Sequence, residues 1–169
     1  AIACASTLGI DKNSAARVLQ SFEGVKGRME EIDLGQPFKT FIDFAHTPNG
    51  LEQALKTLSS QLKTARSRLI CVFGTAGERD KSKRPLMGRV AESYADLIVL
   101  TSEDPRSEDP NEIVREIIKG MKKKSEGKGY YIVINRKDAI QFSINLAKDS
   151  DIVVIFGKGH EKSMTYAKK

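Results

Sequence analysis

Tryptophan is absent from this sequence of 169 residues, cysteine occurs only twice, and no apolar run is long. Two cysteines cannot form a disulfide framework. Cys4 and Cys71 both lie in apolar runs where we expect buried thiols, so the sequence indicates a reducing, cytoplasmic location. The longest apolar runs, such as "DIVVIFG" at 151–157, are too short to span a bilayer, which argues against a membrane protein. No secretory signal is visible, although we do not expect Ala1 to be the native start.

Two glycine patterns that bind phosphate are also missing. The P-loop pattern G-x-x-x-x-G-K-[ST] directs backbone amides and a lysine at phosphate groups. No such spacing follows Gly74 in "CVFGTAGERDKSKRP" (71–85), and the dinucleotide pattern G-x-G-x-x-G is absent too. We therefore do not expect this chain by itself to cradle a triphosphate.

Positive charge is concentrated around that same stretch. The chain has a net charge of +6, and the segment from Lys63 to Arg89 holds eight Lys or Arg residues against Glu78 and Asp80. Such an excess favours an anionic partner nearby. Nucleic acid is not the expected partner, because few aromatic residues interleave with the basic ones and no nucleic-acid-binding motif is present.

Apolar runs of strand length alternate along the chain with segments of helical periodicity. This alternation predicts an α/β, Rossmann-like fold with a mostly parallel sheet of about six strands and helices on both faces. The segment 29–44 also has the pattern of a hairpin, which would add an antiparallel strand. The predicted strands are 39–45, 68–74, 95–102, 130–135 and 151–157, and the predicted helices are 47–63, 83–95, 111–124 and 136–148. The "KKK" of 122–124 is expected in the last turn of its helix.

The first part of the chain has a different character. "AIACASTLGI" and "NSAARVLQSF" predict two short helices, with Asp11 and Asn13 as candidate N-caps. "EGVKG" follows and is typical of a hinge. We expect residues 1–23 to be the tail of a preceding domain and residues 24–169 to form the domain proper.

Charged loops follow four of the predicted strands: "DFAHTP", "GTAGERDKSKRP", "TSEDPRSEDP" and "FGKGHE". Ligands of open parallel sheets bind at the carboxyl ends of the strands, so these loops are the candidate site. Arg79 carries a planar fork that suits a carboxylate. Arg106 lies among acidic residues, a mixture that suits an amino acid. Gly157 allows a close backbone approach, and Glu161 is a candidate acceptor for an ammonium group.

A second group of residues suits a nucleotide. Asp43 ends a strand, where carboxylates often bind ribose hydroxyls. His46 and Arg28 are candidates for phosphate contacts.

Other charged residues of these loops have simpler interpretations. Asp80, Lys81 and Arg84 are expected to form local ion pairs and a helix start. His46 and His160 lack a third metal ligand at a telling spacing, and the acidic loop lacks EF-hand spacing, so no metal site is predicted.

These loops resemble one family. "GRME", "DFAHTPNGLEQAL", "CVFGTAGERDKSKRPLMG", "SEDPRSEDP" and "FGKGHE" occur in the order and approximate spacing of the C-terminal domain of Mur ligases. The resemblance is strongest to those that add the third peptide residue, diaminopimelate or lysine, to UDP-MurNAc-L-Ala-D-Glu. It covers nearly the whole chain and would make residues 1–23 the end of the central ATPase domain.

The resemblance implies an ATP-dependent ligase of peptidoglycan synthesis that forms an amide bond through an acyl phosphate. ATP and magnesium would be bound mainly by the central domain, and the UDP-MurNAc-dipeptide by domains outside this chain, which alone should not catalyse ligation. It implies ATP contacts for Arg28, Asp43 and His46, and amino-acid contacts for Arg79, Asp104, Arg106, Gly157 and Glu161.

One loop departs from the family pattern. The family's D-N-P-R reads Glu103-Asp104-Pro105-Arg106 here, and an aspartate in place of the asparagine removes a donor and adds negative charge. Asp104 would favour a ligand with an extra ammonium, such as lysine, whereas Arg106 favours diaminopimelate. Two alternatives stay open: a glutamate ligase resembling folylpolyglutamate synthetase, whose motif is similar to "AHTP", and a non-catalytic module that binds anions or nucleic acid.

Overall fold

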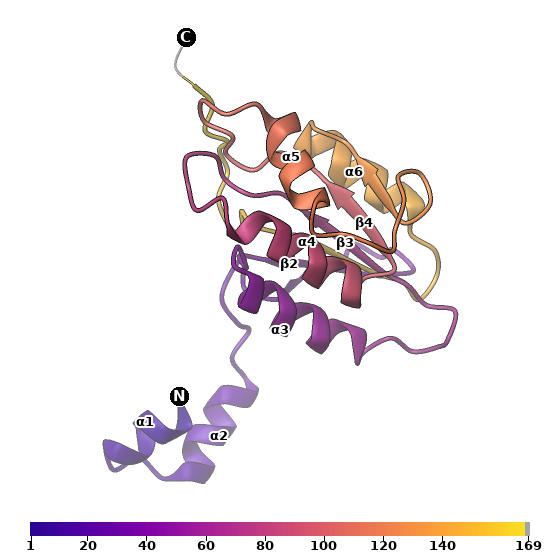
Figure 1. Cartoon of the computed structure of the whole chain (residues 1–169). Helices are drawn as coiled ribbons and strands as arrows, with labels where there is room; N and C mark the ends of the chain where they lie inside the picture. The colour runs from indigo at the N-terminus through magenta and orange to yellow at the C-terminus, as the bar shows by residue number, and fades with distance from the viewer. Residues whose placement is uncertain (168–169) are drawn as a thin grey trace.

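The computed structural model describes residues 1–167, and from residue 39 onward its strands and helices alternate (Figure 1). The strands are β1 (Glu30–Glu31), β2 (Lys39–Asp43), β3 (Leu69–Phe73), β4 (Leu97–Leu100), β5 (Tyr130–Ile132) and β6 (Ile152–Phe156). The helices are α1 (Ile2–Thr7), α2 (Lys12–Gln20), α3 (Pro48–Ser59), α4 (Lys83–Tyr94), α5 (Pro110–Ile118) and α6 (Arg136–Leu146).

The strands form a single sheet in the order β1-β2-β6-β3-β4-β5. β1 pairs antiparallel with β2, as the hairpin pattern predicts, and every other pairing is parallel. The last strand along the chain, β6, lies between β2 and β3. The loop after β6 therefore emerges between the loops that follow those two strands.

Helices cover both faces of the sheet, so the predicted fold class is confirmed. α3, α4 and α5 pack on one face through residues such as Leu55, Met87 and Ile117, all at most 1% exposed. α6 covers the other face, where Ala139 packs among β-branched residues of β3, β4 and β6. Because β3 and β6 are covered on both sides, they are buried along their whole length.

Three helices begin at a capping residue in a loop at the carboxyl edge of the sheet. The Thr47 hydroxyl accepts a hydrogen bond from the Gly50 amide at the start of α3, and Pro48 occupies the first turn. The Asp109 carboxylate caps α5, and Asn135 caps α6 by accepting from two backbone amides. Such caps satisfy amides that have no partner within the helix and mark where each loop ends.

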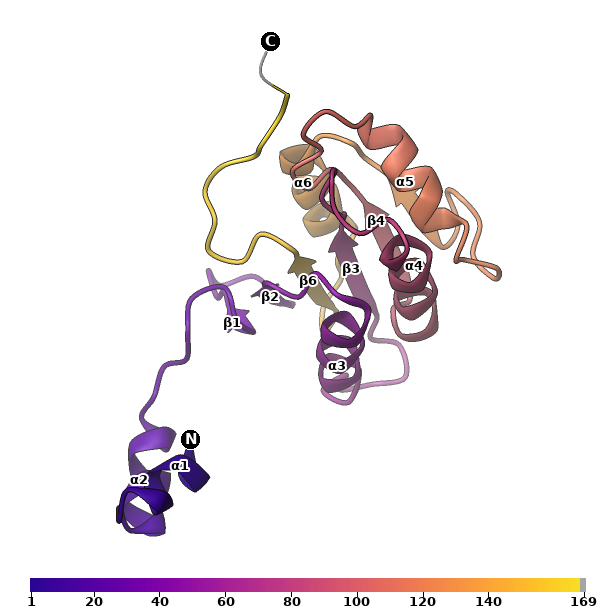
Figure 2. The same ribbon diagram turned by 60° about the vertical axis from the view of Figure 1, so that its left-hand side comes forward.

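The two N-terminal helices stand apart from the sheet and its covering helices (Figures 1 and 2). Asp11 caps α2 by accepting from the Ser14 amide, whereas Asn13, the other candidate cap, lies inside the helix. No residue of α1 or α2 is buried. Cys4 is therefore exposed, and the prediction of a buried thiol there is wrong; Cys71 is buried as predicted.

The prediction for 111–124 is also wrong at its end. α5 stops at Ile118, and the "KKK" segment is not in its last turn. Instead, the backbone amides of Lys122, Lys123 and Lys124 donate to the carboxylate of Glu92 on α4. Because the Glu92 carboxylate accepts hydrogen bonds from these three amides, the segment 122–124 satisfies its backbone donors without continuing the helix.

Candidate functional site

A cleft of about 400 Å³ lies at the carboxyl edge of the sheet, where the loops after β2, β3, β4 and β6 meet. Five of the predicted site residues line it: His46, Arg79, Asp104, Gly157 and Glu161. They come from four loops that are far apart in sequence. The other three, Arg28, Asp43 and Arg106, lie in neighbouring segments but do not line this cleft.

The loops after β3 and β4 cross in direct contact. A Cβ on Gly77 would lie 2.0 Å from the carbonyl oxygen of Pro105, which explains the glycine there. The Gly77 amide donates to the Asp104 carbonyl at 3.0 Å. The carboxylate of Glu78 accepts from both the amide and the hydroxyl of Ser107. The segments that carry Arg79 and Arg106 are thus held together by hydrogen bonds.

A buried arginine reinforces this crossing from below. Arg84 is 0% exposed, and its guanidinium pairs with Glu108 at 3.0 Å and with Glu116 at 2.8 Å. Lys81 pairs with Glu108 as well. Hydrogen bonds from Arg84 and from the Glu78 amide lower the pKa of Glu108 to about 2. Lys81 and Arg84 thus form ion pairs as predicted, but these pairs are not local, because Glu108 and Glu116 lie on other segments. Asp80 accepts from the amide and the hydroxyl of Ser82, just before α4, which fits the predicted helix start.

A lysine that sequence reasoning did not select connects the two acidic residues of the predicted amino-acid site. The Lys158 ammonium donates to both carboxylate oxygens of Asp104 at 2.8 Å and lies 2.6 Å from Glu161. Asp104 also accepts from the Thr165 amide. Although burial opposes the charge, these hydrogen bonds leave the carboxyl pKa of Asp104 lowered. The carboxylate of Asp104 is therefore engaged within the protein.

Residues 165–167 run beside the Asp104–Arg106 loop. The Arg106 amide donates to the Thr165 carbonyl, and the Ala167 amide donates to the Arg106 carbonyl. Both Asp104 and Arg106 have positive φ angles, +40° and +53°, which residues other than glycine rarely adopt. Such strained backbone near a cleft is typical of a functional loop.

Glu103 is a further cleft residue that the sequence did not reveal as a site. It is only 6% exposed, and its Oε2 atom has no hydrogen-bond partner among residues 1–167. Burial raises the pKa of its carboxyl to about 7, despite the nearby cations of Arg136, Lys83 and Lys158. The only hint in the sequence was its position next to Asp104, which departs from the family's D-N-P-R pattern. The burial of Glu103 could not be predicted, because it depends on the packing of other segments.

The residues predicted to contact a nucleotide gather around Phe44, at the end of β2. The exposed Arg28 guanidinium lies 4.2 Å from the Phe44 ring centre, and the His46 ring meets the same aromatic ring edge-on at 5.0 Å. Asp43 is 8% exposed, and its carboxylate accepts from the Met29 and Ala45 amides. The structure thus shows Asp43 anchoring the hinge.

The hinge also touches the loop after β6. A Cβ on Gly27 would lie 2.3 Å from the His160 amide nitrogen and 2.6 Å from the carbonyl carbon of Gly159. Gly27 has a φ of +71°, so this close approach and this conformation both require glycine. The hinge and the loop after β6 therefore share a packed contact.

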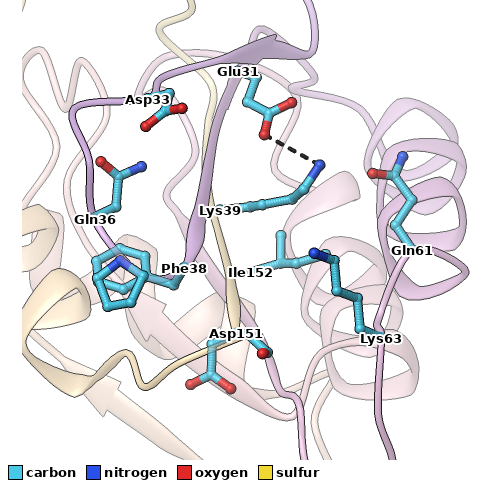
Figure 3. Close-up of a pocket in the computed structure, with 11 residues that line it drawn as sticks. Glu31, Asp33, Gln36, Phe38, Lys39, Gln61, Lys63, Asp151 and Ile152 are labelled. Carbon is cyan, nitrogen blue, oxygen red and sulfur yellow. Dashed lines mark ion pairs between the residues drawn. The ribbon is translucent and has the colours of Figure 1, made fainter.

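Another pocket, of about 260 Å³, lies at the opposite edge of the sheet (Figure 3). It is lined by charges of both signs, including Glu31 and Lys39, which pair with each other at 3.2 Å, and by Asp33 and Lys63. None of the predicted site residues lies there. The carboxyl-edge cleft is the candidate site because the charged loops converge on it.

Within residues 1–167, no cluster of three or more His, Cys, Asp or Glu residues could hold a metal ion. None of the helices in this range combines the length and the apolar character needed to cross a membrane.

A mostly parallel α/β sheet whose carboxyl-edge cleft is lined by one arginine, two lysines and several carboxylates is the class of structure in which small charged ligands are commonly held. The chain belongs to the Mur ligase family, since the family described as "Mur ligase, glutamate ligase domain" matches residues 27–159. The family resemblance seen in the loops is therefore confirmed.

Relatives agree with this assignment. A UDP-N-acetylmuramoyl-L-alanyl-D-glutamate–2,6-diaminopimelate ligase of Syntrophomonas wolfei is 51% identical over 161 residues, covering 95% of this chain and 32% of that protein. A solved structure of a ligase of the same name has 36% identity and a TM-score of 0.74, covering 98% of this chain and 33% of its own. A Mycobacterium tuberculosis folylpolyglutamate synthase, at 21% identity, TM-score 0.66 and coverage of 90% and 34%, shares the fold. The chain spans about a third of the length of the curated relatives it matches.

Proposed function

We propose that the chain is the C-terminal, amino-acid-binding domain of an ATP-dependent ligase that adds diaminopimelate or lysine to UDP-MurNAc-L-Ala-D-Glu. The observation that carries this proposal is the single cleft lined by Arg79, Asp104, Gly157 and Glu161. The name of the Syntrophomonas wolfei relative supports the substrate class. Because the chain covers a third of such proteins, activity belongs to the longer protein, and the isolated chain is expected to be inactive.

In this proposal the domain positions the amine of the incoming amino acid. The Arg79 fork binds a carboxylate of the amino acid with two parallel hydrogen bonds, and Glu161 accepts from an ammonium group. Arg106 contacts a second carboxylate when the ligand has one. Holding the amine in line with an activated carboxyl group converts an encounter between two molecules into a step within one complex.

ATP would be bound between this domain and the preceding one. Arg28 and His46 fit a phosphate, because both lie at the exposed rim around Phe44 and carry nitrogen donors. The Asp43 carboxylate already accepts two backbone hydrogen bonds, so we propose that its first task is to hold the hinge at Met29. Magnesium would be held mainly by the preceding domain.

The N-terminal helices are proposed to belong to that preceding domain. Apolar side chains in these helices and directly after them are exposed, with Val18 at 68%, Leu8 at 79% and Phe22 at 59%. Residues 1–23 would bury this surface in the longer protein, where Gly24, which has a φ of +90° and nothing within 4 Å of its Cβ position, allows one domain to move against the other. Such a protein would work in the cytoplasm, where Cys71 stays a thiol.

Arg79→Ala in the full-length enzyme tests the amino-acid site. A charge-assisted bidentate contact contributes about 1.5–3 kcal/mol, so we expect the KM for the amino acid to rise about 10- to 100-fold while the KM for ATP changes little. Arg89→Ala, on the exposed side of α4 and outside the cleft, is the matched control. Equal effects of Arg79→Ala on both KM values would contradict the assignment.

Calorimetry separates this function from a binding module. Diaminopimelate, lysine, ATP and DNA are titrated in turn into the full-length protein. Binding of an amino acid that Arg106→Ala weakens supports the proposal. Tight, salt-sensitive binding of DNA without any effect of the amino acids would contradict it.

A further inference from the structure

The Lys158 ammonium occupies the acidic part of the cleft. Lys158 is 7% exposed, and its Nζ atom contacts both oxygens of Asp104 as well as Glu161. All three side chains line the cleft. The protein therefore carries an internal ammonium where the sequence alone suggested that Asp104 would meet the ammonium of a ligand.

This contact removes Asp104 from direct ligand recognition. Its Oδ1 atom accepts from Lys158 and from the Thr165 amide, and its Oδ2 atom accepts from Lys158 at 2.8 Å. A ligand ammonium could bind Asp104 only by displacing Lys158, and breaking a largely buried ion pair leaves an uncompensated charge. The negative charge that aspartate adds in place of the family's asparagine is thus neutralised by Lys158 of the same chain.

Counting charges shows what this part of the cleft selects. Asp104 and Glu161 supply two negative charges to the cleft and Lys158 supplies one positive charge, while Arg106, which does not line the cleft, acts on the Asp104 carboxyl group with a second positive charge. These four charges cancel, and the neighbouring Glu103 and Arg136 cancel each other when Glu103 is ionised. The far end of diaminopimelate carries an ammonium and a carboxylate and is also neutral, whereas the far end of lysine is an unbalanced cation.

We propose that Lys158 is a specificity-determining residue, which cancels the charge of Asp104 and thereby makes the cleft prefer a zwitterionic far end over a single ammonium. This inference rests on the proposed function. It extends that function by naming the residue that selects between the two candidate amino acids. Without Lys158, Asp104 and Glu161 would face the ligand with one balancing arginine, a net negative charge that suits lysine.

The experiment compares two substrates in one full-length enzyme. The ratio of kcat/KM for lysine to that for meso-diaminopimelate is measured for the wild type, Lys158→Met, Lys158→Arg and Asp104→Asn, with the product identified by mass spectrometry. Because loss of folded enzyme lowers both rates equally, the ratio responds to selectivity and not to stability.

We expect Lys158→Met to shift the ratio about tenfold or more toward lysine, since one negative charge close to the ligand is then no longer compensated. Lys158→Arg keeps the charge and should stay within about threefold of the wild type. Asp104→Asn, which introduces the family's residue and leaves Lys158 uncompensated, should shift the ratio about tenfold away from lysine.

An unchanged ratio in Lys158→Met would overturn the proposal. If that variant does not fold, Asp104→Asn decides, because a ratio that is unchanged or moves toward lysine has the same meaning. The double variant Asp104→Asn/Lys158→Met removes both charges and should return the ratio to near the wild-type value. A wild-type enzyme that ligates neither amino acid would refute the proposed function itself, whereas normal ligation with unaltered ratios would refute only the role of Lys158.

Discussion

Glu103 should give the stability of the chain a pH dependence opposite in direction to that of most carboxylates, and Glu103→Gln should remove it. Glu103 is 6% exposed, and burial raises the pKa of its carboxyl from the ordinary value of 4.5 to about 7. Between these two values the folded chain binds a proton that the unfolded chain has released. The free energy of unfolding must therefore fall as the pH rises through this window.

The magnitude follows from the two pKa values. Each tenfold difference in proton affinity corresponds to about 1.4 kcal/mol, so the complete change amounts to about 3 kcal/mol. The cost of ionising Glu103 is absent below pH 4.5 and complete above pH 7. Glutamine has a similar shape and never ionises, so the variant lacks this dependence.

Urea denaturation of the 169-residue chain, followed by circular dichroism at several pH values from 4.5 to 8, measures the effect. The unfolding free energy of Glu103→Gln minus that of the wild type should rise by about 3 kcal/mol from pH 4.5 to pH 8. Other groups cancel in this difference, and Glu112→Gln, at an exposed position of α5, controls for exchanging a carboxyl for an amide. A difference that stays constant with pH, or falls, would refute the reasoning.

Two further substitutions test the contacts around the cleft. Gly157→Ala should lower the free energy of unfolding by about 2 kcal/mol or more, because a φ of +103° strains any L side chain and the new Cβ, 1.9 Å from Glu103 Oε2, would displace a carboxyl group that is only 6% exposed. Gly127→Ala, with a φ of +77° and nothing within 4 Å, should cost about 1 kcal/mol, and equal costs in urea denaturation would count against the steric explanation. Arg84→Met should destabilise the chain by about 3–5 kcal/mol, since it removes the buried partner of Glu116 and leaves Glu108 paired only with the exposed Lys81 among the described residues. Arg115→Met, in an exposed pair, should cost less than about 1 kcal/mol, and a similar small loss for Arg84→Met in thermal denaturation would show that the buried network contributes little.

Much of the fold could be predicted because its signals are local. The uninterrupted apolar runs at 68–74 and 151–157 became β3 and β6, which are buried on both faces. The proline after Thr47 and the one after Asp109 mark the true starts of α3 and α5. The end of α5 was not predictable in this way, because a carboxylate on α4 captures the amides of the following segment.

The candidate site was predictable in part for the same reason. Gly157, Arg79 and Glu161 follow strand ends, so a parallel sheet must bring their loops to one edge. The partners of each charge were not predictable, because Lys158 and Asp104 are 54 residues apart in sequence. Nor did the sequence show that the Asp43 carboxylate accepts from the Met29 amide, just after the hinge.

The sequence by itself determined the class of sheet, the set of charged loops and the family to which they belong, since periodicity, caps and motifs are properties of short segments. Tertiary structure alone decided that β6 inserts between β2 and β3, that the Glu103 carboxyl group is buried away from solvent, and that Lys158 neutralises Asp104. Strand order, desolvation and ion pairing all depend on contacts between distant parts of the chain, and no local pattern encodes them.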